Sequence, residues 1–203
     1  DSLGSLQYVN RVLKLTSNTS IEVCWESCNP CITTPAENLF ISEWGEGISS
    51  NRYFEIFNPT NDTINLSNYA YARVNGNPTN IGVYEYWSDF DSGSAILPLD
   101  VFIVAHSAAD SIILANADML VSGTTALSNG DDGLALVFGS EPTSPIAPDG
   151  ITYAILDWLG DWNGDPGQGW VVSGVNAATR DHTIIRNCNI TQGDTSWANS
   201  AAN

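Results

Sequence analysis

Three glutamates flank one short hairpin of this chain: Glu43, Glu46 and Glu55. Two carboxylates that lie close together can act as general acid and general base when burial raises the pKa of one of them. The same residues can instead be structural. In that interpretation Glu43 and Glu55 bind Arg52, Arg73 or backbone amides and shape the turn. Both interpretations stay open at the level of these residues alone.

Two acidic loops carry the oxygen atoms that Ca²⁺ prefers as ligands. We expect that the protein requires no cofactor, and Ca²⁺ is the only candidate ligand of this kind that we consider. Asp161, Asn163 and Asp165 alternate in a D-x-N-x-D pattern, which lets side-chain oxygens converge on the ion. A complete EF-hand also needs a late glutamate in the loop, and Val172 stands at that position, so a polar turn is the alternative. The candidate ligands of the two loops are Asp157, Asp161, Asn163, Asp165, Asp89 and Asp91.

The two histidines, His106 and His182, do not stand in a catalytic pattern. The chain contains neither a G-x-S-x-G nucleophile elbow nor an H-E-x-x-H zinc motif. We therefore expect that the protein is not an enzyme and that both histidines are structural.

The cysteines form a C-x3-C-x2-C cluster of Cys24, Cys28 and Cys31, with Cys188 alone near the other end. Four thiolates could bind zinc, but the paired C-x2-C knuckles of zinc sites are missing. An even number of cysteines in an acidic, lysine-poor chain favours disulfides in an oxidising compartment. Of the three possible pairings we prefer Cys24–Cys28 with Cys31–Cys188, whose longer loop would stabilise the fold by about 4 to 5 kcal/mol.

Aromatic side chains beside polar loops can stack on sugar rings or anchor a protein partner. Trp87 and Trp162 are the candidates for exposure, and Tyr84 and Tyr86 extend the group around Trp87. In the alternative interpretation about half of the tryptophans fill the core. The residue pattern predicts burial for Trp44, Trp158 and Trp170.

The overall charge excludes one class of partner. Acidic residues number 23 against 6 basic ones, for a formal net charge of -17. This charge repels phosphates, so we expect no binding to nucleic acid. No apolar run approaches the roughly 18 residues of a membrane span, so we expect none.

Short apolar segments separated by Gly, Asn, Asp and Pro clusters predict an all-β sandwich or barrel. Residues 1–31 differ from the rest and predict a β-hairpin, which must pack on another surface because two strands alone are unstable. Residues 32–38 are expected to be a linker. The expected strands of the main domain are 38–44, 53–57, 70–74, 83–86, 101–106, 134–138, 151–158 and 183–186, with one short helix at 107–116.

The stretch from Leu39 to Thr60, LFISEWGEGISSNRYFEIFNPT, resembles the opening hairpin of bacterial lamin-tail domains. That family implies an immunoglobulin-like, two-sheet antiparallel sandwich over residues 39–203, with an extra N-terminal hairpin and one short helix. It also implies structural roles for the hairpin glutamates. The resemblance covers about four-fifths of the chain. It continues in order through Asn65–Tyr69, Asp100–Ser107, Asn129–Phe138, Asp165–Trp170, Thr179–Asn187 and Gly193–Ser200.

Two further resemblances are short. The N-terminal hairpin resembles the closing hairpin of small β-sandwich modules in large secreted bacterial proteins. Three Asp-hydroxyl-apolar triplets resemble a bacterial O-glycosylation signal, and their candidate acceptors are Ser2, Thr63 and Ser111.

The expected function is therefore a non-catalytic extracellular module, secreted or on a bacterial cell surface, for adhesion, assembly or structural spacing in a larger protein. Its expected partners are neighbouring modules or identical chains that pair through strand edges, together with cell-surface glycans. We expect residues 7–25 to pair with an adjacent copy or domain. One alternative is a carbohydrate- or calcium-dependent binding module. Another is an accessory domain of a secreted nuclease or phosphatase.

Overall fold

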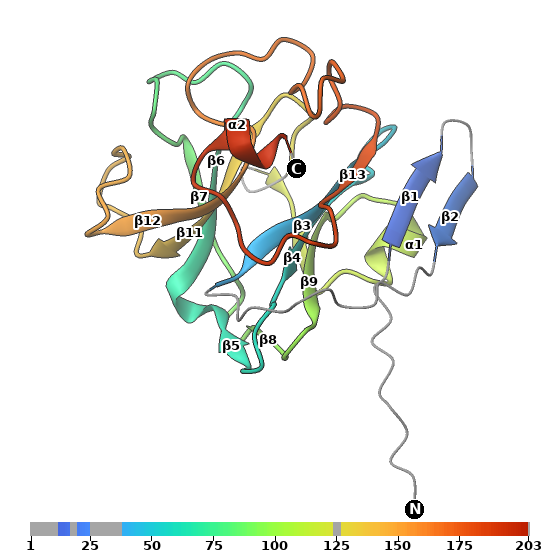
Figure 1. The fold of residues 1–203 in the computed structure, drawn as a ribbon, viewed down its shortest axis with the longest axis horizontal. Helices are drawn as coiled ribbons and strands as arrows, with labels where there is room; N and C mark the ends of the chain where they lie inside the picture. The colour runs from blue at the N-terminus through green and yellow to red at the C-terminus, as the bar shows by residue number, and fades with distance from the viewer. Residues whose placement is uncertain (1–11, 17–19, 25–37, 124–126, 203) are drawn as a thin grey trace, which may run out of the picture.

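The computed structural model describes residues 12–16, 20–24, 38–123 and 127–202, the first two ranges by their backbone alone. Within these residues the chain forms an all-β sandwich of two stacked sheets (Figure 1), which confirms the predicted fold class at this level. The helices of this part are short: η1 (Leu66–Asn68), α1 (Ser111–Leu114) and α2 (Trp197–Ser200).

The first sheet has five strands in the order β10-β9-β4-β3-β13. One pair, β9 with β10, is parallel, whereas we predicted an antiparallel sandwich. The segment that carries α1 connects these two strands. A parallel pair needs such a long connection, because the chain must return to the starting end of the sheet before the second strand begins. The strand bounds are β3 (Phe40–Glu46), β4 (Arg52–Phe57), β9 (Val101–His106), β10 (Met119–Val121) and β13 (Thr183–Ile185).

The second sheet has four antiparallel strands in the order β12-β11-β6-β7. A two-stranded sheet of β5 and β8 lies at one end of the sandwich (Figure 1). The strand bounds are β5 (Ile64–Asn65), β6 (Tyr69–Val74), β7 (Tyr86–Asp89), β8 (Ala95–Ile96), β11 (Gly133–Gly139) and β12 (Tyr153–Leu159).

The core lies between the two sheets and follows the alternation of side chains along each strand. In β4, Phe54 and Ile56 point into this core, whereas Tyr53 packs on the opposite face. The ring of Phe54 meets the ring of Tyr71 from β6 at a centroid distance of 5.1 Å. Burial of such aliphatic and aromatic side chains is the main driving force of the fold.

The outer face of the second sheet carries a layer of aromatic rings. Small residues of β6 and β11, such as Ala70, Ala72 and Ala135, line this face. Because these side chains are short, large rings can lie directly over the strands. The rings come mainly from the connecting loops and from β12, and they are Tyr84, Tyr153, Trp158 and Trp162.

The N-terminal strands β1 (Val12–Thr16) and β2 (Ser20–Cys24) form a two-stranded sheet of their own. β1 lies close to β3 and β13 (Figure 1), but it does not join the hydrogen-bond ladder of the five-stranded sheet. The hairpin therefore contacts its own sandwich, and its pairing with an adjacent copy stays a prediction.

The predicted strands agree with the structure except at one place. We expected a strand at 83–86, but the strand is β7, at Tyr86–Asp89. The reason is that Tyr84 is buried in the outer aromatic layer, and Glu85 accepts hydrogen bonds from the backbone N–H groups of Asn75 and Thr79, which holds a loop. β5, β8, β10 and α2 were not predicted, because these elements are too short to give a periodic pattern.

Asn58 organises the end of β4. Its side chain is fully buried, and its amide nitrogen donates to the backbone carbonyls of Asp62, Ile96 and Leu97 at 2.8 to 3.1 Å. The amide oxygen accepts from the backbone N–H and the hydroxyl of Thr60. This residue joins the loop after β4 to the loop before β9.

We predict that Asn58→Ala lowers the free energy of unfolding by about 2 to 4 kcal/mol, because the loss of its amide leaves buried backbone groups without hydrogen bonds. Urea unfolding monitored by tryptophan fluorescence measures this change. Asn61→Ala is the matched control in the same loop, since Asn61 is exposed. Equal stability of the two variants would contradict the prediction.

Candidate functional site

The two hairpin glutamates lie directly opposite each other on neighbouring strands. Glu43 of β3 is in register with Glu55 of β4, and their side chains are 3% and 7% exposed. Arg52 and Arg73 were the predicted partners of Glu43 and Glu55. In the structure Arg52 forms an ion pair with Glu46 at 3.7 Å, and Arg73 forms one with Asp132 at 3.4 Å.

Glu55 is held in a site that favours its protonated form. Burial raises its pKa to about 7, and the negative charges of Asp100 and Asp118 add to this effect. The hydroxyl of Ser42 donates to Glu55 Oε1 at 2.7 Å, which partly opposes the shift. A carboxyl with this pKa could exchange a proton near neutral pH, but its burial keeps a substrate from reaching it.

Glu43 is bound by the phenol of Tyr53, which donates a short hydrogen bond to Glu43 Oε1. Burial, and then the charge of Glu43, raise the pKa of Tyr53, so the phenol keeps its proton and remains a donor. Tyr53 packs beneath the connection that carries α1, against Ile103, Ala105 and Ile113. These contacts give the hairpin carboxylates a structural role.

Asp157 was a candidate calcium ligand, but the structure buries it completely and gives it protein donors. Its Oδ2 accepts from the backbone N–H of Ile41 at 2.9 Å and from Arg186 Nη2 at 3.0 Å. Its Oδ1 accepts from the backbone N–H of Asp194 at 3.0 Å and from the hydroxyl of Ser200 at 3.2 Å. With four donors already on its two oxygens, Asp157 is a structural anchor.

The other calcium candidates do not converge. Asp161 Oδ1 accepts from the backbone N–H of Asn163, and Asp165 Oδ1 accepts from the backbone N–H of Gly167, so both side chains hold local turns. Asp89 Oδ1 accepts from the indole of Trp87. Within the described ranges no three carboxylate, histidine or cysteine side chains are grouped so that they could hold a metal ion.

The predicted aromatic binding group is only partly at the surface. Trp162 is 1% exposed, so its predicted exposure is wrong, and Tyr84, which we placed in the same binding group, is 3% exposed. Both belong to the outer aromatic layer, where Trp162 donates its indole N–H to the carbonyl of Gly133. Trp87 and Tyr86 are half-buried, and the ring of Tyr86 lies against the guanidinium of Arg73. Burial is confirmed for Trp44, Trp158 and Trp170.

The predicted disulfides and glycosylation sites involve several residues outside the described part of the chain. Cys188 is exposed and its thiol is free, whereas Cys28 and Cys31 lie outside this part of the chain, as does the side chain of Cys24. The Cys31–Cys188 pairing is thus not formed in this structure, and Cys24–Cys28 stays a prediction. Of the candidate glycosylation acceptors, Thr63 and Ser111 are exposed, and Ser2 lies outside the described residues.

An open polar groove that was not predicted lies at the end of the sandwich where β3 ends and β4 and β11 begin. We call it the loop-end groove, and its volume is about 370 Å³. Three connections form it: the β3–β4 turn, the loop before β11 and the long loop between β12 and β13. Its lining residues are Glu46, Gly47, Ile48, Ser49, Arg52, Asn129, Asp131, Gly167, Gln168, Arg180 and Asp181.

Charges of both signs meet in this groove. Arg180 Nε lies 3.5 Å from Asp181 Oδ2, and both side chains are largely exposed. Glu46 accepts from the backbone N–H of Asp181, and burial raises the pKa of Glu46. Burial and the nearby charge of Asp165 raise the pKa of Asp131. The only sequence signal for the groove is that Arg52 and Arg180 lie next to turns in a chain with few basic residues.

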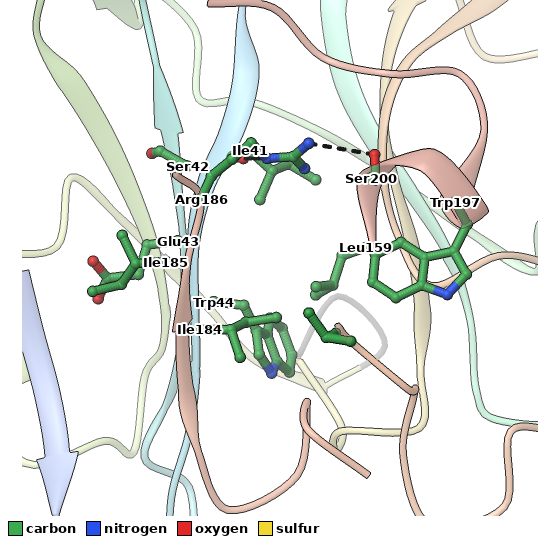
Figure 2. A pocket seen from close by; sticks show the side chains of 11 residues that line it. Ile41, Ser42, Glu43, Trp44, Leu159, Ile184, Ile185, Arg186, Trp197 and Ser200 are labelled. Carbon is green, nitrogen blue, oxygen red and sulfur yellow. Dashed lines mark hydrogen bonds between the residues drawn. The ribbon is translucent and has the colours of Figure 1, made fainter. Parts of the chain in front are cut away.

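A smaller apolar cavity, the β13 socket, lies between β13 and α2 (Figure 2). Its volume is about 50 Å³, enough for one small aliphatic group. Arg186 and Ser200 form its polar side and are joined by a hydrogen bond of 3.3 Å. The apolar side consists of Ile41, Trp44, Leu159, Val172, Ile184 and Trp197.

Comparisons with known proteins do not assign this chain to a family. No protein-family model matches it, and no curated protein matches it either. No helix of the described residues has the length and apolar character of a membrane span. The function must therefore be inferred from the geometry.

We predict that Arg186→Met lowers the free energy of unfolding by about 3 to 5 kcal/mol, because it leaves the buried charge of Asp157 without its cation. The control is Arg180→Gln, which removes an exposed ion pair and should cost less than about 1 kcal/mol. Urea unfolding at pH 7 compares the two variants. A small and equal loss in both would show that Asp157 does not need its arginine.

We also predict that Glu55 makes stability depend on pH. Its folded-state pKa of about 7 is above the ordinary value of 4.5, so the folded state binds the proton more tightly and the free energy of unfolding falls as pH rises from 4.5 to about 7. The loss is on the order of 3 kcal/mol. Glu55→Gln should remove this part of the pH dependence, and urea unfolding at pH 5 and pH 8 measures it. An identical difference between the two pH values in both proteins would refute the assignment.

Proposed function

We propose that this chain is a non-catalytic β-sandwich module of a secreted or surface protein, and that it serves assembly by joining a second copy through the edge strand β13. The observation that carries this proposal is an edge strand flanked by exposed apolar side chains and an apolar socket. The buried carboxylates support the non-catalytic part, because Glu43, Glu55 and Asp157 are each bound by donors of the fold itself.

β13 ends the order of the five-stranded sheet, and its register shows which backbone groups point outward. The backbone N–H of Glu46 donates to the carbonyl of His182, and that of Arg186 donates to the carbonyl of Ser42. In an antiparallel ladder the inward and outward groups alternate, so the N–H and C=O of Ile185 point away from β3. Outward-pointing groups on an edge are the template for an added strand.

Exposed apolar side chains lie on this edge and on the loop that borders the socket. Ile185 is 48% exposed, and Val171 and Val175, from the loop that borders the socket, are 49% and 56% exposed. An added strand that pairs with β13 could cover Ile185, which points away from the socket, and place a small apolar side chain in the β13 socket on the other face (Figure 2). β1 lies close to β13 but outside its ladder, so the hairpin is a candidate for the strand that a copy contributes.

The sequence supports the extracellular setting of this proposal. The acidic surface suits a soluble extracellular module, and the order of motifs from Leu39 to Ser200 resembles lamin-tail domains. Two of the candidate O-glycosylation acceptors, Thr63 and Ser111, are exposed as modification requires. These observations favour a module that presents surface within a larger assembly.

We predict that the purified chain self-associates reversibly and that Ile185→Lys abolishes this, because a lysine on an edge strand opposes the addition of another strand. Sedimentation analysis over a range of concentrations measures the average mass. Ile151→Lys is the matched control, since Ile151 is 92% exposed but precedes β12 and does not lie on β13. A chain that is monomeric at every concentration, or identical behaviour of the two lysine variants, would contradict the proposal.

A further inference from the structure

Two of the six lysine and arginine residues of this acidic chain, Arg52 and Arg180, line the loop-end groove. Arg73 and Arg186 are largely buried and form ion pairs with Asp132 and Asp157. In the described part of the chain, the groove therefore holds the guanidinium groups that can reach a ligand.

Both groove arginines retain capacity to bind an anion. Arg180 is 46% exposed, and its ion pair with Asp181, itself 63% exposed, is of the weak surface kind that a ligand can replace. The side chain of Arg52 is 20% exposed and also lines the groove, where its Nε lies 3.7 Å from Glu46 Oε1. A ligand carboxylate suits the planar fork of a guanidinium.

The remaining groove residues suit hydroxyl groups. Asp131 and Asp181 supply carboxylate oxygens, and Asn129 and Gln168 supply amides that both donate and accept. Ile48, which is 74% exposed, adds one apolar contact at the rim. The volume of about 370 Å³ falls in the range of small-molecule sites.

We propose that the loop-end groove binds an acidic saccharide, with the sugar carboxylate on Arg180 and Arg52 and its hydroxyls on the carboxylates and amides of the groove. A phosphate group carries about −1.5 to −2 charges at pH 7, so the three carboxylates of the groove and the negative chain repel it more than they repel a single sugar carboxylate. This binding site is separate from the β13 edge, so it adds a ligand to the proposed assembly function.

The test is a titration of the full chain, followed by amide chemical shifts, with α-1,4-linked digalacturonic acid as the probe. Gly47, Ser49 and Gly167 line the groove, so the chemical shifts of their backbone amides report binding there. We expect saturable shifts at these amides and a Kd in the millimolar range or tighter. We expect binding at least about tenfold weaker for neutral α-1,4-galactobiose, since it lacks the charged acceptor.

Arg180→Gln should weaken binding of the acidic sugar by roughly tenfold, because it removes a charge-assisted hydrogen bond. Asn61→Asp is the control, since it changes the net charge by the same amount at an exposed position in another loop. It should keep the affinity within about twofold, because an exposed charge far from the site is screened by salt. Gln168→Ala gives a second groove variant, and urea unfolding checks that all variants are folded.

Three outcomes would overturn the inference. They are absence of shifts with digalacturonic acid, an unchanged affinity of Arg180→Gln, and equal affinity for a control ligand. The control ligands are the neutral sugar, which lacks the carboxylate, and glycylglycine, which has a carboxylate but no sugar hydroxyls. None of these outcomes affects the assembly proposal, which self-association tests. Mass spectrometry of the sugar after the titration separates the two questions further. Cleavage of the disaccharide would contradict the non-catalytic function while leaving the binding site in place.

Discussion

One buried carboxylate, Asp157, joins the parts of the chain that close the sandwich. It belongs to β12 of the second sheet, binds the backbone of Ile41 in β3 of the first sheet, and pairs with Arg186 just after β13. It also binds Asp194 and Ser200 in the C-terminal segment. A buried charge is costly unless all its acceptor positions are satisfied. Because Asp157 lies in the second sheet and its donors lie in the first sheet, just after β13 and in the C-terminal segment, the charge is satisfied only when all these parts are in place.

Similar buried contacts hold the long loop between β12 and β13, and thereby one wall of the loop-end groove. The indoles of Trp162 and Trp170 donate to the carbonyls of Gly133 and Asp132 at the start of β11. The fully buried Thr179 donates to Gly130 and precedes Arg180 of the groove. The buried polar side chains are thus bound by groups of the fold itself, whereas the loop-end groove and the β13 edge are the two surfaces to which we assign a ligand and a partner. This division favours a module that binds and assembles.

The fold could be predicted from the sequence because alternation and turn residues act locally. The strand at Val101–His106 has the predicted bounds, and most of the others differ by one or two residues. The site could not be predicted, since it depends on contacts between distant segments. Asp157 looked like part of a metal loop, yet its partners are 29 to 116 residues away. Trp162 lies in a polar loop. It packs in the aromatic layer because three alanines of β6 and β11, which are distant in the sequence, leave space for its ring. Nothing local in the sequence indicates either contact.

Native-state hydrogen exchange at the backbone amides of Ile41 and Asp194 tests the role of Asp157 most directly, because both amides donate to its carboxylate. If Asp157 closes the sandwich, these two amides exchange only when the whole domain unfolds, and their opening free energy equals that of global unfolding. Fast exchange of either amide through local opening, while the core strands stay protected, would contradict this account.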